Sequence, residues 1–429
     1  MSDAREQAIH GKLPLLQALP LGLQHMLAIF AGTVAAPLIV AEALGLIPAD
    51  KTLIIQATLF MSGLGTLLQS VGIGPVGARL PLVLGTNFAF IGIAVTIGGQ
   101  LGLSAVFGGA LAAGLFLIFA GYIIKYLRFL FPPLITGLCI LLIGLNLLPL
   151  AFSLAFGGAD AADFGATRHS LLAMTVLVTA IVLHQFGKGF LSLVSIIIAM
   201  IAGYLIAWFM GFVDLTVLEQ ARWAATPAVV PFGLSFEFSA VFSFVLISLV
   251  AITETIGDIS GTTIAGVDRE PTDKEMSGGV MADGCATTLA SAFGCMPLVT
   301  YSQNVGLIAL TGVVSRHVVS LAGVFLIITG LFPKLAAIIG AIPAAVLGGV
   351  SILLFGSVVA AGLKMIGLAS FNQRNMLIIG LALAIGIGLP EQTGFLERLP
   401  GQLRITMETG LVPAILTAII MNLVLPGRD

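Results

Sequence analysis

Charged side chains are scarce in this chain of 429 residues. Lysine and arginine number 18 and aspartate and glutamate 20, so 9% of the residues are charged, against about 25% in ordinary soluble domains. This scarcity excludes a conventional water-soluble surface. The net charge of −2, without any run of basic residues, also leaves no positively charged face for nucleic acid.

Two further absences narrow the possibilities. Cys139, Cys285 and Cys295 lie in apolar segments without CxxC spacing, so we expect neither a disulfide framework nor a zinc site, and no bound cofactor. The polar residues 1–20 lack the short apolar core and cleavage site of a signal peptide. We therefore expect the first apolar segment to remain in the membrane.

Hydrophobic residues make up 58% of the chain, and the mean hydropathy is +1.13. The 52 glycines and 19 prolines suit membrane helices, where small residues allow close packing and breaks are satisfied inside the bundle. The composition predicts a large helical membrane protein.

Apolar runs separated by polar, glycine or proline residues predict fourteen membrane segments. They cover residues 21–43, 52–72, 80–99, 104–124, 132–152, 170–187, 190–213, 239–260, 277–293, 297–312, 317–340, 343–363, 375–389 and 409–425. Segments 80–99, 297–312 and 375–389 are short or interrupted, compared with the ~20 residues of a straight crossing.

The distribution of basic residues predicts that both termini are cytoplasmic. With the N-terminus inside, 12 of the 18 basic residues fall on the cytoplasmic side and 6 outside, which agrees with the positive-inside rule. The twelve are Arg5, Lys12, Arg79, Lys125, Arg128, Lys188, Arg269, Lys274, Arg316, Lys364, Arg374 and Arg428.

Two segments resemble each other internally. "LPLVLGTNFAF" at 80–90 and "MPLVTYSQNVG" at 296–306 share Pro-Leu-Val, and each has an amide six residues after the proline, Asn87 and Gln303. One is the third of the first seven segments, and the other is the third of the second seven segments. Because seven is odd, the two halves would insert with opposite topology, which is typical of inverted-repeat transporters. Chance similarity in apolar sequence is the alternative.

Two carboxylates interrupt the apolar stretch "SLVAITETIGDISG" at 248–261. Glu254 and Asp258 are four residues apart and share one face of a helix. Carboxylates inside a membrane are costly and usually face a partner, a cavity or a proton. The two carboxylates on this face are predicted to bind N–H groups of a ligand or a proton. The alternative is a structural role, with neighbouring hydroxyls as hydrogen-bond partners.

Other polar residues in apolar segments are candidates for the same site. His25 is either a proton relay or a structural histidine, and Asp283 is a third acid that we expect to support the site. Thr300 to Asn304 are five consecutive hydrogen-bonding residues. An amide both donates and accepts, which suits a heterocycle with alternating N–H and C=O groups. Phe88 and Phe90 offer rings for stacking, and simple packing is the alternative because the chain has 27 phenylalanines.

At these residues the chain resembles the nucleobase-ascorbate transporter family, also called nucleobase-cation-symport family two, and within it the bacterial xanthine and uric acid permeases. The motifs are "LQHMLAIFAGT", "GTNFAF", "TETIGDISGTT", "GGVMADG", "YSQNVGLIALTGVVSR" and "IPAAVLGGVSILLF", which span nearly the whole chain.

The resemblance implies an all-α polytopic fold of 14 transmembrane segments in two inverted repeats, with short strands in segments 3 and 10. Segments 1–4 and 8–11 would form a core domain and the others a gate domain, through which family members dimerise. The implied boundaries are 1–20 for the cytoplasmic N-terminus, 21–131 and 238–340 for the core, and 132–237 and 341–429 for the gate. The location would be the bacterial inner membrane.

The resemblance also implies roles for individual residues. Glu254 would bind the N–H groups of a base and Gln303 its carbonyl edge, with backbone at Phe88 and Ser302 completing the frame. The remaining implied residues are Asn87, which would tune xanthine against urate, Phe355, which would close over the base, Asp258, which would take part in proton coupling, and His25, Asp283 and Asn304, which would support the site.

We therefore expect proton-coupled uptake of xanthine, with protons as the coupling ion and sodium as an alternative. Uric acid is the nearest rival substrate and uracil a more distant one. An anion transporter of related fold predicts a basic residue at the site, and segments 3 and 10 contain none in their motifs. A passive channel and an intramembrane enzyme are disfavoured, the latter because neither GxSxG nor HExxH accompanies the acids.

Overall fold

A computed structural model describes residues 7–124, 132–159, 161–214 and 216–426. Arg5, Lys125, Arg128 and Arg428, which were counted for the orientation, lie outside these residues. The main elements are α2 (Leu15–Ala43), α3 (Pro48–Val71), β1 (Leu84–Thr86), η1 (Phe88–Phe90), α4 (Ile91–Leu101), α5 (Leu103–Tyr122), α7 (Pro133–Ala155), α8 (Thr167–Phe186), α9 (Phe190–Leu193), α10 (Ser195–Phe209), α11 (Thr216–Gln220), α12 (Phe238–Val267), α13 (Asp273–Ala292), β2 (Leu298–Thr300), α14 (Ser302–Thr311), α15 (Arg316–Gly330), α16 (Pro333–Gly340), α17 (Ala344–Ile366), α18 (Gln373–Gly388), α19 (Thr393–Leu396), α20 (Gly401–Glu408) and α21 (Leu411–Val424).

Local sequence explains where several of these helices begin and end. Proline occupies the first turn of α3 and α7, where its missing N–H costs nothing. Thr272 and Glu275 form a capping box at the start of α13. α12 ends where Asp268 takes a left-handed backbone conformation with φ of 58°.

The helices are long and apolar enough for a multi-pass membrane protein. Within the described residues, seven helices qualify as membrane spans, or nine if the pairs α15–α16 and α20–α21, bent by 84° and 82°, count as one span each. Each of the fourteen expected segments contains a helix or a strand followed by a helix. Several are too short or, as in α13, too polar to qualify alone, so the count of fourteen stays a prediction.

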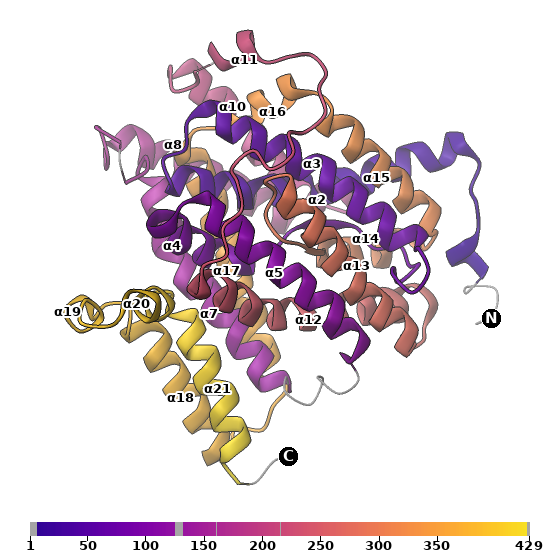
Figure 1. Cartoon of the computed structure of the whole chain (residues 1–429). Helices are drawn as coiled ribbons and strands as arrows, with labels where there is room; N and C mark the ends of the chain where they lie inside the picture. The colour runs from indigo at the N-terminus through magenta and orange to yellow at the C-terminus, as the bar shows by residue number, and fades with distance from the viewer. Residues whose placement is uncertain (1–6, 125–131, 160, 215, 427–429) are drawn as a thin grey trace.

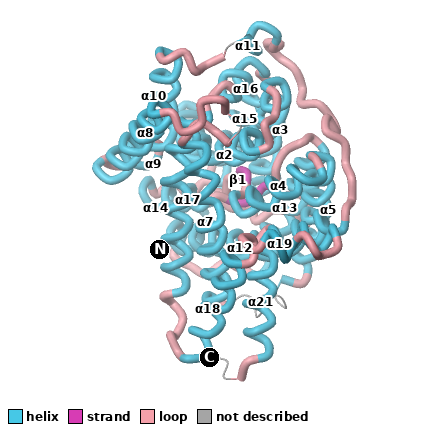
Figure 2. Tube along the Cα trace, turned by 90° about the vertical axis from the view of Figure 1, so that its left-hand side faces the viewer, coloured by secondary structure: helices cyan, strands magenta, loops and turns pink. Residues whose placement is uncertain are grey.

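Two short strands lie side by side at the centre of the helical bundle, where Figure 2 labels β1. β1 and β2 pair antiparallel, with Leu84 opposite Thr300 and Thr86 opposite Leu298. β1 leads into η1 and α4, and β2 leads into the half-helix α14. The expected strands in segments 3 and 10 are therefore present, and pairing satisfies backbone groups that no lipid could satisfy.

The strands are held by close contacts with α2. A Cβ on Gly85 would lie 2.4 Å from Thr33 Oγ1 and 2.5 Å from Tyr301 Cε2, so only glycine fits there. The Tyr301 hydroxyl donates to the Thr86 carbonyl over 2.7 Å, and the Thr86 hydroxyl donates to the Thr33 carbonyl over 2.8 Å.

The helices form two packed groups. In the strand group, α5 packs along α13 and α3 along α15, with the two strands, α2, α12 and α14 beside them. In the α17 group, α7, α8 and α10 pack around α17, and α18 pairs with α21. Glycines bring these helices together: a Cβ on Gly114 would lie 2.4 Å from Thr288 Oγ1, and one on Gly348 would lie 2.1 Å from the Ala155 nitrogen.

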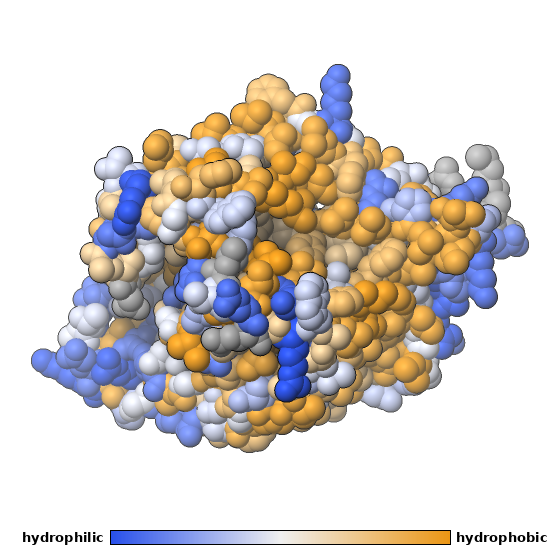
Figure 3. All heavy atoms as spheres, turned by 90° about the horizontal axis from the view of Figure 1, so that it is seen from above, coloured by the Kyte–Doolittle hydropathy of each residue, from blue (hydrophilic) through white to orange (hydrophobic). Residues whose placement is uncertain are grey.

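The bundle has two distinct ends (Figure 1). We call the end that carries the N-terminal residues the terminal face. There Ser315 donates to the Gly11 carbonyl, and the Gly77 N–H donates to the Gly278 carbonyl. The opposite face carries Glu42 and the start of α17. Figure 3 shows broad apolar areas between smaller hydrophilic clusters, as expected of a surface that contacts lipid.

Candidate functional site

A cavity of about 660 Å³ lies beside the paired strands, between the two helix groups. Its walls come from the β1–η1 and β2–α14 connections, α12, α7 and α17. Six of the ten predicted site residues line it: Asn87, Phe88, Glu254, Asp258, Ser302 and Gln303. Phe88 and Ser302, 214 positions apart in the chain, thus meet in one space because β1 and β2 pair.

Glu254 is hydrogen-bonded to Asn87, which belongs to the β1–η1 connection. The Asn87 side-chain nitrogen donates to Glu254 Oε2 over 2.8 Å, while its oxygen accepts the backbone N–H of Ala89 and caps η1. The cap orients the amide, so its nitrogen points at the carboxylate. Within the described part of the chain the other Glu254 oxygen accepts no hydrogen bond, so it can meet a ligand N–H group.

Asp258, one helical turn further along α12, is hydrogen-bonded to the β2–α14 connection. Its two carboxylate oxygens accept the hydroxyls of Thr300 over 3.0 Å and Ser302 over 2.5 Å. The side chain is 5% exposed. Asp258 therefore ties α12 to β2 and α14, whereas Glu254 ties α12 to η1.

Asp283 is buried behind the cavity and does not line it. It accepts the Thr255 hydroxyl over 2.5 Å and the Gln69 side-chain nitrogen over 3.2 Å. Gln69 also donates to the Gly279 carbonyl and accepts the Ala78 N–H. Sequence reasoning missed Gln69, although an amide near the end of an apolar segment was a usable signal.

His25 is also buried, and it faces Asn304 instead of the acids. Its Nδ1 lies 2.6 Å from Asn304 Oδ1, and the Asn304 nitrogen donates to the Pro81 carbonyl over 2.5 Å. This chain links α2 to α14 and to the segment before β1. In this structure His25 and Asn304 support the strands and do not line the cavity.

Phe355 lies behind Phe88 and is fully buried. The two rings meet edge to face with centroids 6.3 Å apart, so Phe355 supports the ring that lines the cavity. Gly257 lines the cavity between the two carboxylates, and a Cβ there would meet no atom within 4 Å. Its missing side chain keeps this part of the cavity open.

The cavity reaches toward the terminal face. Lys364 and Met365, in the last turn of α17, and Leu368, just after it, line the cavity together with the central residues. Lys364 was not expected at the site, because the motifs of segments 3 and 10 contain no lysine or arginine. Lys364 belongs to the α17 group, whereas the two carboxylates belong to the strand group. Its nearness to them cannot be inferred from neighbouring positions in the sequence.

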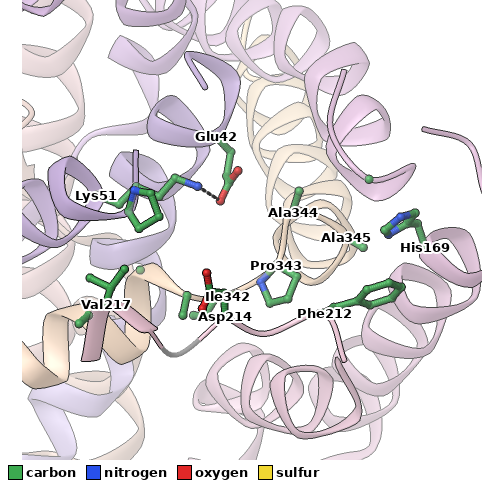
Figure 4. A pocket seen from close by; sticks show the side chains of 15 residues that line it. Glu42, Lys51, His169, Phe212, Asp214, Val217, Ile342, Pro343, Ala344 and Ala345 are labelled. Atoms are coloured by element: carbon green, nitrogen blue, oxygen red, sulfur yellow. Dashed lines mark hydrogen bonds and ion pairs between the residues drawn. The ribbon is translucent and has the colours of Figure 1, made fainter. Parts of the chain in front are cut away.

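Within the described ranges, no three His, Cys, Asp or Glu side chains converge as metal ligands do. A second cavity, of about 280 Å³, opens on the opposite face (Figure 4). There Lys51 Nζ bonds Glu42 Oε1 over 2.6 Å, and the His169 and Phe212 rings stack with centroids 4.7 Å apart. It contains none of the predicted site residues.

Solved structures of similar shape are membrane transporters. The transmembrane domain of the cyanobacterial bicarbonate transporter BicA superposes with a TM-score of 0.56 at 16% identity, covering 96% of this chain and 99% of that one. The murine anion transporter Slc26a9 in its inward-facing state gives 0.63 at 13% identity, over 96% and 69%. The fold is that of a multi-pass membrane transporter.

Sequence comparison identifies the family. The model of the Permease family matches residues 16–395. A putative purine permease of Clostridium perfringens is 38% identical over 94% of this chain and 89% of its own, and the Bacillus subtilis xanthine permease and uric acid permease PucK are 35% and 36% identical over 95% of this chain and 93% and 95% of theirs. The chain belongs to this family of permeases, as the motifs indicated.

Proposed function

We propose that this protein is a proton-coupled symporter that imports xanthine across the bacterial inner membrane by alternating access. The observation that carries the proposal is the convergence of Glu254, Gln303 and Asp258 on one cavity beside the paired strands. Relatives named as xanthine and uric acid permeases support the purine assignment.

The chemistry of the cavity suits a dioxopurine. The Glu254 carboxylate accepts ring N–H groups, and the Gln303 amide both donates and accepts along the alternating edge. Phe88 and Ser302 begin η1 and α14, where the first amide groups lack partners within their own helix. These backbone donors would face the purine carbonyls.

Alternating access would use the two helix groups. We assign the strand group to the core (21–131 and 238–340) and the α17 group to the gate (132–237 and 341–429), in two inverted seven-segment repeats. The cavity lies between the groups, and its lining includes Lys364 near the end of α17. We assign the face at that end to the cytoplasm. Movement of the core against the gate would open it to the other side, and the gate would also form a homodimer.

Proton coupling would depend on the neighbouring carboxylates Glu254 and Asp258. A dry, unpaired carboxylate opposes movement through an apolar boundary, so protonation near this pair would permit the loaded core to move. Sodium is the alternative coupling ion. Uptake of labelled xanthine with and without an inward proton gradient distinguishes proton coupling from sodium coupling. Accumulation that does not depend on the proton gradient would overturn proton coupling.

Uric acid is the second candidate, because Lys364 lines the cavity and would attract an anionic purine. Competition of labelled xanthine uptake by unlabelled xanthine, urate, hypoxanthine, guanine, uracil and bicarbonate tests the assignment in cells without their own carriers. We expect competition by xanthine, alone or with urate. Strong competition by uracil or bicarbonate would overturn the substrate, and Glu254→Gln should abolish uptake while preserving expression.

A further inference from the structure

A short helix, α20, connects the α17 group to the strand group on the opposite face. It lies between α18 and α21, which pair with each other, and it meets α21 in a bend of 82°. Figure 1 shows α20 at the end of these two helices that lies away from the C-terminus. On its other side α20 contacts α12, which carries the two site carboxylates, and α4, which follows η1. One segment of the α17 group thus touches two helices that adjoin the substrate cavity.

Gln402, in the first turn of α20, caps α12. Its side-chain oxygen accepts the backbone N–H of Ser239 over 2.9 Å, and its side-chain nitrogen donates to Glu237 Oε2 over 3.2 Å. The first N–H groups of a helix have no partner inside that helix, and Glu237, which precedes α12, makes no side-chain cap. A side chain from a distant segment therefore does the work of a local cap.

Glu408 makes the second contact, at the other end of α20. The side-chain nitrogen of Gln100, in the last turn of α4, donates to Glu408 Oε2. Arg404 Nε donates to Glu408 Oε1 over 2.6 Å from one turn earlier on the same helix, so the carboxylate is oriented from within α20. The two ends of α20 are thus bonded to two different helices beside the cavity.

The start of α12 is fixed to the strand group by the loop that precedes it. The Ser235 N–H donates to the carbonyl of Ser104, in α5, over 2.9 Å. The ring of Phe232 stacks on that of Phe107, also in α5, with centroids 5.5 Å apart. Because α5 belongs to the strand group, the start of α12 belongs to it as well. The contacts of α20 therefore join the two groups, and any movement of one group against the other has to break them.

The chemistry of these contacts suits a reversible connection. Gln100, Glu237 and Gln402 are exposed, so water can replace each hydrogen bond when it breaks. The net contribution of one such bond changes an equilibrium constant roughly twofold to tenfold. The contacts are strong enough to favour one arrangement of the groups and weak enough to break in every transport cycle.

We propose that α20 is a clasp that holds the two helix groups together on the opposite face and keeps the substrate cavity closed to that side. Gln402 and Glu408 are its two contact points, and their release lets the cavity open there. The inference rests on the alternating access proposed above, but it depends neither on which purine is carried nor on the coupling ion.

The test follows a reporter cysteine, Thr253→Cys, in the full chain in membrane vesicles. Thr253 lines the cavity from α12, and its hydroxyl donates to its own helix at Val250, so the substitution removes no contact with another element. A membrane-impermeant maleimide is applied to right-side-out and to inverted vesicles. The chain without the added cysteine gives the background from its three native cysteines. The measured quantity is the rate of labelling from the outside divided by the rate from the inside.

Gln402→Ala should raise this ratio roughly twofold to tenfold, because it weakens the clasp by the loss of its hydrogen bonds to α12. Gln100→Ala, which removes the donor to Glu408, should also raise it. The matched control is Gln392→Ala, because Gln392 is an exposed glutamine of the same connection whose side chain makes no cap. It should leave the ratio unchanged, and all three variants should keep the Tm of the parent.

A ratio in Gln402→Ala that equals the ratio in Gln392→Ala, or falls below it, would overturn the clasp. The labelling needs neither substrate nor a proton gradient. A chain that fails to take up xanthine but shows the expected change in ratio would keep the clasp and lose the substrate assignment. A chain that takes up xanthine without any change in ratio would do the reverse.

Discussion

The side-chain amide of Asn87 donates to the carboxylate of Glu254 over 2.8 Å, across 167 positions of sequence. Asn87→Ala removes this donor and leaves one Glu254 oxygen unpaired. A hydrogen bond to a charged group contributes about 1.5–3 kcal/mol, so we expect KM for xanthine to rise at least about tenfold. Thr96→Val, on the following helix and outside the cavity lining, is the control. An unchanged KM in Asn87→Ala would contradict a role for this contact.

The hydroxyl of Ser302 is expected to matter through Asp258. Ser302→Ala removes one of the two donors that orient this carboxylate and should reduce uptake, while Ser302→Thr should retain most of it. Ser357→Ala is the matched control, because Ser357 lines the same cavity but donates to its own helix at Leu354. Initial uptake rates at equal surface expression distinguish them, and equal losses in all three variants would refute the assignment.

Gly257 should tolerate no large side chain in a working transporter. A Cβ at this position meets no atom within 4 Å, so Gly257→Phe would direct a ring into the cavity, and we expect normal folding and lost uptake. Gly380→Phe introduces the same ring at an open, exposed position of α18 and should transport normally. Uptake combined with thermal melting of both variants is the measurement. Normal transport by Gly257→Phe would mean that substrate passes elsewhere.

Gln69 should contribute mainly to stability. Gln69→Leu leaves Asp283 without one donor and the Ala78 N–H without its acceptor, and each buried unsatisfied group costs about 1–3 kcal/mol. We expect a clear drop in Tm in detergent, whereas Gln100→Leu, at an exposed position, should change Tm little. Equal Tm values for the two variants would count against the Gln69 network.

The loop between α7 and α8 should give a pH-dependent stability at acidic pH. Hydrogen bonds from Arg168 and His169 lower the pKa of Asp163 from its ordinary 3.8 to about 2. Since the folded-state pKa is the lower one, the stabilisation is present near neutral pH and is lost as pH falls from about 4 toward 2. The Tm difference between the parent and Asp163→Asn should therefore shrink below pH 4. A difference that is constant from pH 7 to 3 would show that the charge of Asp163 is unimportant.

The class of protein and much of its site were predictable from local patterns. Scarce charge and long apolar runs required a membrane protein, because lipid cannot solvate ionised groups. Glu254 and Asp258 stood out for the same reason, and the paired Pro-Leu-Val motifs indicated that segments 3 and 10 correspond, while the strands in them were implied by the family resemblance. These signals lie in short stretches of the chain, so they can be read without the fold.

Only the tertiary structure decided which of the polar residues share one cavity. It placed Asn87 against Glu254 and Ser302 against Asp258, but it turned His25 toward Asn304 and put Phe355 behind Phe88. It also brought in Lys364 and Gln69, whose contacts depend on how α17 and α3 pack against distant segments. The amino-acid sequence by itself determined that polar groups are buried in a membrane, because burial follows from composition. Their partners were decided by the pairing of two strands and the close packing of glycine-lined helices, which are long-range contacts that no local pattern contains.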